Sequence, residues 1–186
     1  MSAEELDLDD LQRRMNGALS VLKTELSGLR TGRASIALVE PITVEAYGQS
    51  MPINQVGTVS VPEPRMLSIQ VWDKGMVSAV EKAIRESNIG INPVVDGQLL
   101  RLPIPEMNQE RRQEMVKVAH SYAEGAKVAI RHVRRDGMEM CKKAEKDGMS
   151  EDEAHIYQEE IQELTDKAVK DVDEMLAVKE QDIMQV

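Results

Sequence analysis

The chain of 186 residues has no phenylalanine, one tryptophan and three tyrosines, so aromatic side chains make up only 2% of it. Hydrophobic residues still account for 41%, and a core must therefore be built from Leu, Val, Ile, Met and Ala. Such small and flexible side chains suit helices that pack closely along their length better than a thick globular core. With 30% charged residues, the composition is that of a folded, helix-rich protein.

Cysteine and long apolar runs are also scarce. The single cysteine, Cys141, excludes an intramolecular disulfide and fits a reducing cytosol. No apolar run approaches the roughly 20 residues that a membrane-spanning helix needs. The first ten residues are acidic, which argues against a secretory signal and against an Arg-rich transit peptide. We expect a cytoplasmic protein without a membrane segment.

Residues that could carry chemistry are dispersed. His120, His132 and His155 show no metal-ligand spacing, and we expect Cys141 to be a buried or bystander thiol. Gly32 lies in a basic turn without the spacing of a phosphate-binding loop, so it predicts a helix stop with positive φ. We therefore expect no metal and no cofactor.

The net charge of −10 is unevenly distributed. Residues 105–135 contain seven Lys and Arg against four Asp and Glu, whereas residues 136–186 contain six against sixteen. The whole-chain charge, which disfavours nucleic acid as a partner, thus conceals a local basic stretch followed by an acidic one.

An amphipathic helix is predicted for residues 4–29. Its apolar residues recur at steps of three and four, which places them on one side of a helix: Leu8, Leu11, Met15, Ala18, Leu22, Leu26 and Leu29. Acidic residues between positions 7 and 10 lie near the positive end of the helix dipole, which favours them. The segment Arg30–Arg33 then interrupts the pattern.

A second helical region begins at Glu106. Its predicted seam comprises Met115, Ala119, Tyr122, Ala126, Ala129 and Val133, continued after a phase slip by Gly137, Met140 and Ala144. A turn is predicted at 146–150, where Gly148 ends one helix and Ser150 with Glu153 forms a capping box for the next. The stripe of that last helix comprises Tyr157, Ile161, Leu164, Ala168, Val172, Met175 and Ile183.

The segment between these regions has a different character, because all seven prolines lie between positions 41 and 105. Asp73 is expected to cap a helix over 74–87 that Asn88 and Gly90 stop. Pro62 is expected to end a strand, and Trp72 to lie in the core. Strands are predicted at 42–47, 55–61, 66–72 and 98–104, with turns at 48–50 and 95–97.

These patterns predict an α+β protein, in which an elongated antiparallel three-helix bundle carries an inserted small β/α/β domain. Three apolar stripes of similar length would bury one another in such a bundle. The bundle would comprise residues 1–30 and 105–186, and the inserted domain residues 31–104. The two connections would lie side by side as a paired hinge, and we expect a bent molecule with few contacts between its arms.

A basic face is predicted on the second helical region. Lys127, Arg131 and Arg134 are spaced at i, i+4 and i+7, with Arg135 beside them. They lie roughly opposite the predicted seam and have few acidic neighbours one turn before them, so we expect them to face outward without intrahelical partners. Such guanidinium groups suit bidentate contacts to phosphate. A merely solvated charged face is the commoner explanation of this pattern, and it stays open.

Several separate segments resemble the ribosome recycling factor family in order and spacing. They are Leu29–Ser35, Pro62–Asp73, Ala79–Ile84, Gly90–Pro93, Arg101–Pro105, Glu110–Arg112, Leu164–Asp166, Lys179–Gln185 and, most of all, Val128–Asp136. The resemblance covers essentially the whole chain and rests on independent motifs, so chance is a poor explanation. The family's L-shaped fold of two domains agrees with the architecture predicted above.

The resemblance implies a non-enzymatic translation factor. Such a factor binds the post-termination ribosome across the acceptor and peptidyl-tRNA sites, and elongation factor G with GTP then drives it to separate the subunits. The ribosome is thereby released from mRNA for a new round of translation. The bundle would lie against large-subunit rRNA, including elements of the inter-subunit bridges. GTP hydrolysis would belong to elongation factor G, and we expect this chain to be a monomer.

The resemblance also implies roles for individual residues. It implies RNA binding by Arg131, Arg134, Arg135, Lys127, Arg111 and Arg112. It implies a hinge made of Arg30, Thr31, Gly32, Arg33, Pro103, Ile104 and Pro105. The chain departs from many members at His132 and Gly137, where Asn and Ala are common. Because Gly costs roughly 1 kcal/mol against Ala inside a helix, we expect a softer helix near residue 137.

Two other functions stay open from the residues alone. A helical adaptor or chaperone-like module would expose an apolar groove and would show no salt-dependent affinity for ribosomes. A hydrolase acting on peptidyl-tRNA would need a nucleophile, or a general base with an orienting partner, converging in one pocket. The dispersed His, Cys and carboxylate positions show no such arrangement.

Overall fold

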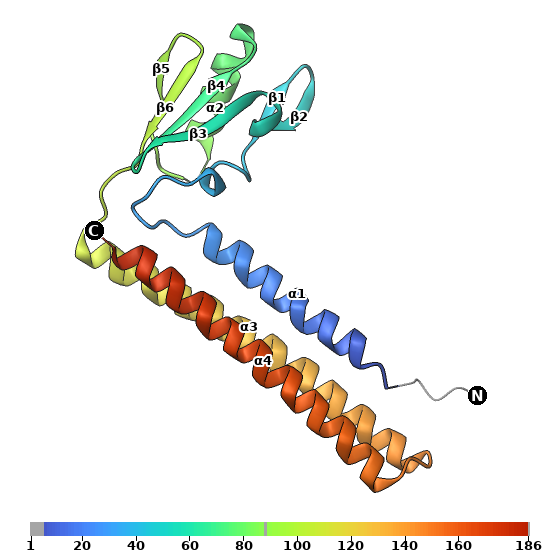
Figure 1. The fold of residues 1–186 in the computed structure, drawn as a ribbon. Helices are drawn as coiled ribbons and strands as arrows, with labels where there is room; N and C mark the ends of the chain where they lie inside the picture. Colours follow the sequence, from blue (N-terminus) through green and yellow to red (C-terminus); the bar gives the residue numbers. More distant parts are fainter. Residues whose placement is uncertain (1–5, 88, 186) are drawn as a thin grey trace. The chain divides into compact units, whose positions relative to one another are not determined.

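The computed structural model describes residues 6–87 and 89–185. The chain forms two compact units, of which the helical unit comprises the chain up to Leu26 together with Val116–Asp182. The sheet unit comprises Ser27–Met115 and the residues from Ile183 onward. Long helices and a small antiparallel sheet confirm the predicted α+β class (Figure 1). The predicted domain limits at 30/31 and 104/105 and the bent shape stay predictions.

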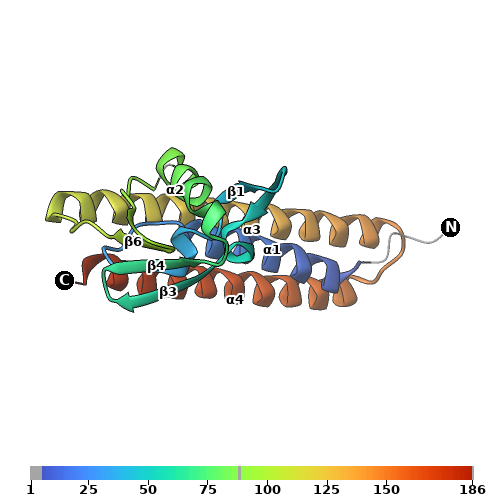
Figure 2. The same cartoon turned by 90° about the horizontal axis from the view of Figure 1, so that it is seen from above.

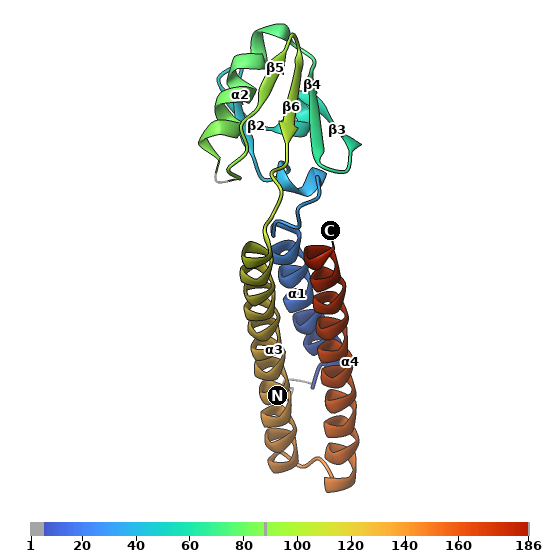
Figure 3. The ribbon, with the colours of Figure 1, turned by 90° about the vertical axis from the view of Figure 1, so that its left-hand side faces the viewer.

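Three helices run side by side along the helical unit (Figures 2 and 3). They are α1 (Leu8–Ser27), α3 (Gln109–Lys146) and α4 (Glu151–Met184). The last residue of α1, the last two residues of α4 and the start of α3 up to Met115 belong to the sheet unit. The side chain of Asp7 begins α1 by accepting the backbone N–H of Asp10 at 3.1 Å. The predicted helix over 4–29 was too long at its C-terminal end, and residues 4 and 5 lie outside the described part.

The predicted stripes of α1 and α4 are confirmed. Leu11, Met15, Leu22 and Leu26 are buried on α1. Ile161, Ala168, Val172 and Ile183 are buried on α4. Since the described chain has so few aromatic residues, this core is made of aliphatic side chains and methionine that interdigitate between the helices.

The turn between α3 and α4 also lies where it was predicted. Gly148 has a φ of 115°, which only glycine adopts without strain. Ser150 Oγ accepts the backbone N–H of Glu153 at 3.2 Å and so caps α4. At its other end α3 begins three residues later than predicted, because the side chain of Asn108 accepts the backbone N–H of Arg111 at 2.8 Å and caps the helix there.

The predicted seam of α3 was partly wrong. Ala129 and Met140 were expected inside but are exposed, whereas Ala123, Ile130 and Cys141 are buried. The physical reason is that α3 packs against α1 and α4 together. A helix with two neighbours buries a wider arc than a single seam. Ala126, Val133 and Gly137 are buried as predicted, whereas Ile130 and Cys141 take the places expected for Ala129 and Met140.

At Gly137, α1 and α4 both pack closely against α3. A Cβ atom at this position would lie 2.9 Å from Leu11 Cδ1 on α1 and 3.1 Å from Ile161 Cδ1 on α4. The absence of a side chain thus lets both neighbours pack directly on the backbone of α3. Gly137, which was expected to soften the helix, is therefore a packing residue.

Six strands and one short α-helix, α2, are found among the described residues of the sheet unit. A four-stranded antiparallel sheet has the order β3-β4-β6-β5, and β1 and β2 form a separate hairpin. The helix α2 (Val77–Glu86) packs Val80 and Ile84 into the same core as the strands. The strands are β1 (Thr43–Ala46), β2 (Gln49–Pro52), β3 (Gly57–Glu63), β4 (Met66–Val71), β5 (Val94–Asp96) and β6 (Leu99–Pro103).

Three details of these strands differ from prediction. The strand β3 passes Pro62, because the register shifts between Ser60 and Glu63 and the proline needs no partner in that bulge. The first hairpin turns at Tyr47 and Gly48, both with positive φ, rather than at 48–50. Residues 95 and 96 were predicted as a turn but pair in β5, so the turn moves to residues 97 and 98.

Asp73 caps the helical segment that follows β4, as predicted. Its Oδ1 accepts the backbone N–H of Gly75 at 2.9 Å. A 3-10 turn over Lys74–Met76 precedes α2, so the α-helix itself starts later than expected. The predicted stop at Asn88 lies outside the described residues.

Trp72 was predicted to be a core residue, and this was wrong. Its side chain is 60% exposed, and Nε1 donates to Thr58 Oγ1 at 3.0 Å. The two-residue period of β4 puts Trp72 on the same side as the exposed Gln70, away from the α2 face. The core is filled from the other side by Leu67, Ile69 and Val71.

The same substitution at two glycines of α3 should reveal the close approach at Gly137. Gly125→Ala meets nothing within 4 Å and should raise the free energy of unfolding by about 1 kcal/mol through helix propensity. Gly137→Ala must displace Leu11 and Ile161, which offsets that gain, so we expect a smaller increase or a loss. Urea unfolding followed by helix circular dichroism measures both variants. Equal stabilisation by the two would contradict this packing.

Cys141 should be unreactive while the protein is folded. It is fully buried, and burial raises the pKa of its thiol, with the charge of Glu145 adding to the effect. Because the thiolate is the reactive form, a thiol reagent at pH 7 should label the native protein far more slowly than the urea-unfolded protein. At pH 9, where the thiol of the unfolded chain is largely ionised, labelling of the native chain should still be far slower, because its raised pKa and its burial both limit reaction. Rapid labelling of the native protein would contradict the buried position.

Candidate nucleic-acid interface

The predicted basic face lies on two consecutive turns of α3 within the helical unit. The buried residues Ile130, Val133 and Gly137 fix the rotation of α3. That rotation divides the cations into two sets. Lys127 and Arg134 lie at the boundary with α4, and Arg131 and Arg135 are exposed.

Lys127 and Arg134 both have partners on α4, which corrects the prediction that they face outward. Lys127 Nζ lies 2.7 Å from Asp173 Oδ1, and its side chain is only 22% exposed. Arg134 Nε donates to Gln162 Oε1 at 2.8 Å. One heptad before Lys127, His120 contacts Glu180 of α4. Residues spaced by seven return to the same side of a helix, so these three contacts join α3 to α4 along their length.

Arg131 also has an unforeseen partner, although it remains exposed. Its Nη1 lies 3.2 Å from Glu124 Oε1, two turns earlier on α3, and both side chains are more than half exposed. An ion pair in water is weak and exchanges readily with other anions. Arg135 is exposed and forms no ion pair within residues 6–87 and 89–185. Arg131 and Arg135 are therefore the most exposed cations of this face.

Arg111 and Arg112, which were also predicted to bind RNA, belong to the sheet unit. They lie in the first turn of α3, where Arg111 is exposed. Arg112 is half-buried, and its Nε is buried without a hydrogen-bond partner in the described part of the chain. The four basic residues farther along α3 thus form one group and these two form another.

The predicted hinge residues are tied to the sheet unit by hydrogen bonds. Arg30 donates to the carbonyl of Ile89. The backbone N–H of Ala34 donates to the carbonyl of Pro64 at 2.7 Å, and that of Ile104 donates to the carbonyl of Arg65 at 2.8 Å. Both connecting segments are thus anchored at the turn between β3 and β4. Gly32 has the predicted positive φ, 76°, but it does not stop the helix, because α1 already ends at Ser27.

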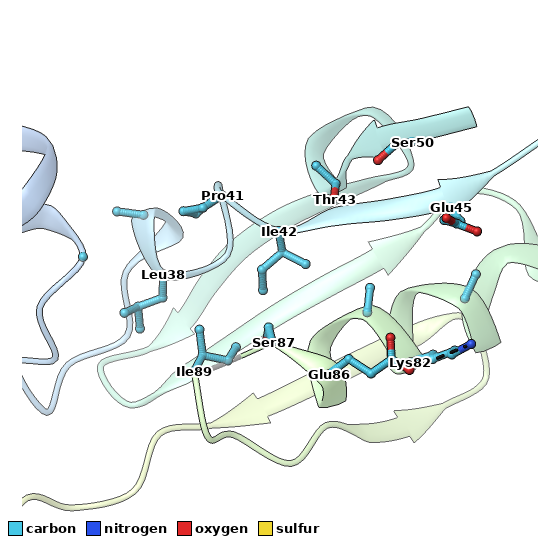
Figure 4. Close-up of a pocket in the computed structure, with 14 residues that line it drawn as sticks. Leu38, Pro41, Ile42, Thr43, Glu45, Ser50, Lys82, Glu86, Ser87 and Ile89 are labelled. Atoms are coloured by element: carbon cyan, nitrogen blue, oxygen red, sulfur yellow. Dashed lines mark ion pairs between the residues drawn. The ribbon is translucent and has the colours of Figure 1, made fainter. Parts of the chain in front are cut away.

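The sheet unit also contains a cleft of about 950 Å³. Figure 4 shows Lys82 and Glu86 of α2 on one side, joined by an ion pair of 3.9 Å, and Thr43 and Ser50 of the first hairpin on the other. The residues that line it include the apolar Leu38, Ile42 and Ile89 and contain no His or Cys.

In the described residues, no three or more His, Cys, Asp or Glu side chains are grouped for a metal ion. No described helix is long and apolar enough to cross a membrane.

Some residues of interest escaped the sequence analysis. The partners Glu180 and Asp173 on α4 could have been sought from the seven-residue spacing of His120 and Lys127 on α3 in an antiparallel pair. Gln162 and Asp166 had no such signal. The exposed Tyr47 had no such signal either. Its hydroxyl donates to Asp73, which lowers the pKa of Asp73 and raises that of Tyr47.

Comparisons with known proteins agree with this architecture. Two curated relatives, the ribosome-recycling factors of Xanthobacter autotrophicus and Methylocella silvestris, are each 63% identical over 187 residues, and the match covers 100% of both chains. A solution structure of ribosome recycling factor is similar with a TM-score of 0.82 and 44% identity, covering 100% of both chains.

A second solved structure shows a relative with its partners. It contains the T. thermophilus ribosome recycling factor and E. coli elongation factor G bound to the E. coli post-termination complex. That factor is 42% identical with a TM-score of 0.68, covering 99% of this chain and 100% of that one. The family described as ribosome recycling factor matches residues 22–184. The chain therefore belongs to the ribosome recycling factor family.

Proposed function

We propose that this chain binds the post-termination ribosome through large-subunit rRNA and, with elongation factor G and GTP, separates it into subunits. The observation that carries the proposal is the exposed pair Arg131 and Arg135 on a rigid helix. The rest of the helical unit is acidic, so RNA phosphates would be attracted to this face and repelled elsewhere. Arginine suits the contact because its planar guanidinium binds phosphate bidentately.

The proposed action needs no reaction on this chain. A bound factor shifts an equilibrium only if it binds one state better than the other. A stiff helical unit on the large subunit would favour separated subunits if it occupied the region where they join. Elongation factor G would hydrolyse GTP, and this chain, a cytoplasmic monomer, would transmit the resulting force. The T. thermophilus relative bound with elongation factor G to a post-termination complex supports these partners.

The remaining predicted residues have graded roles in this proposal. Arg131 and Arg135 make the first phosphate contacts, and Arg134 joins them from the boundary with α4. Lys127, held by Asp173, contributes mainly to the local positive potential. Arg111 and Arg112 extend the contact from the sheet unit. Residues 30–33 and 103–105 form the hinge, supported by the positive φ of Gly32.

Loss of the Arg131 guanidinium should impair splitting. An ionic hydrogen bond contributes about 1.5–3 kcal/mol, so Arg131→Ala should slow splitting of post-termination ribosomes by roughly tenfold or more at limiting factor concentration. Light scattering with elongation factor G and GTP measures the rate. Arg13→Ala is the matched control, because Arg13 is an exposed arginine of the same unit that pairs with one acidic residue of its own helix. Equal rates for both variants would remove Arg131 from the interface.

Removal of the acidic partner of Arg131 should have the opposite effect. Glu124 competes with phosphate for the Arg131 guanidinium, and exposed pairs of this kind contribute about 0.2–1 kcal/mol. Glu124→Gln should therefore strengthen binding to isolated large subunits by up to about fivefold at low salt, and should lower the free energy of unfolding by no more than about 1 kcal/mol. Glu139→Gln, an exposed glutamate of the same helix, controls for net charge. Weaker binding by Glu124→Gln would show that the ion pair supports the contact.

A further inference from the structure

Arg134 differs from the other cations of α3 in the chemistry of its partner. Lys127 lies against the carboxylate of Asp173, and Arg131 lies against that of Glu124. Arg134 instead donates its Nε–H to the amide oxygen of Gln162 on α4 at 2.8 Å. A neutral acceptor orients a guanidinium but leaves its positive charge in place.

Gln162 is itself held in one orientation. Its Nε2 donates to Asp166 Oδ1, one turn later on α4, at 2.8 Å. If the amide were flipped, its NH₂ group would face the Arg134 guanidinium, a donor against a donor, and its oxygen would face a carboxylate. The chain from Asp166 through Gln162 to Arg134 therefore has one favourable arrangement.

This arrangement leaves the terminal nitrogens of Arg134 available. Arginine has five N–H donors, and the bond to Gln162 uses the one on Nε. Arg134 forms no ion pair in the described part of the chain. Because Arg134 is half-buried, its stem is packed while its Nη groups keep four donors. Two parallel N–H groups of a fixed guanidinium match two oxygens of one phosphate.

We propose that Gln162, itself held by Asp166, is a positioning residue that fixes the guanidinium of Arg134 for an RNA phosphate. This inference rests on the function proposed above and adds a residue outside the basic segment. Holding Arg134 in advance lowers the entropy lost when it binds. Immobilising one long side chain costs about 0.5–1.5 kcal/mol, which corresponds to a roughly two- to twelvefold change in affinity.

The test measures the affinity of the full-length protein for isolated large subunits over a range of salt concentrations. Gln162→Met keeps the length of the side chain and removes both hydrogen bonds, and it should weaken binding about three- to tenfold. Gln158→Met, a half-buried glutamine one turn earlier on α4, is the matched control and should leave binding unchanged. Thermal unfolding of both variants checks that the helical unit is intact.

The dependence on salt separates positioning from direct contact. Gln162→Met retains the Arg134 charge and should keep the wild-type slope of log affinity against log salt. Arg134→Ala should reduce the slope by about one phosphate contact. In the Arg134→Ala background, Gln162→Met should have no further effect. A persisting effect would mean that Gln162 acts by itself and would overturn the proposal.

A second variant tests the same chain of contacts, and for it a pure charge effect and a loss of positioning predict opposite changes in binding. Asp166→Ala removes a negative charge, which by charge alone should strengthen RNA binding, as at the exposed control Glu163→Ala. Positioning predicts that Asp166→Ala binds more weakly than Glu163→Ala, because Gln162 is released. If Asp166→Ala binds as strongly as Glu163→Ala, the proposal is contradicted. This comparison can be made even if Gln162→Met does not fold.

The outcomes also separate this inference from the function on which it rests. A folded wild type that does not bind large subunits would overturn the proposed function and this inference together. Wild-type binding that Arg131→Ala weakens and Gln162→Met leaves unchanged would overturn the inference alone. Weakening by both Gln162→Met and Asp166→Ala, each dependent on Arg134, is the expected result.

Discussion

The packing of α3 between α1 and α4 at Gly137 determines how the rest of the helical unit is presented. With no side chain at this position, Leu11 and Ile161 lie directly against the helix backbone, and α3 cannot rotate without opening that contact. The rotation in turn decides which basic residues meet α4 and which meet solvent. A packing contact in an aliphatic core thus sets the electrostatic surface of the molecule.

The acidic residues of α4 have two different effects on the cations of α3. Asp173 takes up the charge of Lys127 across the helix boundary, whereas Asp166 acts on Arg134 only through the neutral amide of Gln162. The high acidic content of residues 136–186 therefore does not simply oppose the proposed RNA binding. It joins the helices along one side of α3 and leaves the positive charge of Arg131, Arg134 and Arg135 concentrated on a small area.

Local chemistry explains why parts of the fold were predictable. The caps at Asp73 and Ser150 depend on side chains within three residues, and the positive φ of Gly32 and Gly148 depends on the glycine itself. The apolar stripes of α1 and α4 follow the helical period. The strand that passes Pro62 was missed because a bulge depends on the register with β4, which is a property of the pair of strands.

The sequence alone determined the fold class, the order of helices and strands, and the position of the basic segment, because periodicity, capping and composition act over a few residues. The family resemblance added the function that these features serve. Only the tertiary structure decided that Trp72 is exposed, that Ala129 is outside and Ile130 inside, and that Lys127 and Arg134 have partners on α4. Those outcomes depend on which neighbour lies against each side of an element. The residue pattern of one helix or strand does not say which neighbour packs against it, because that neighbour comes from residues far away in the sequence.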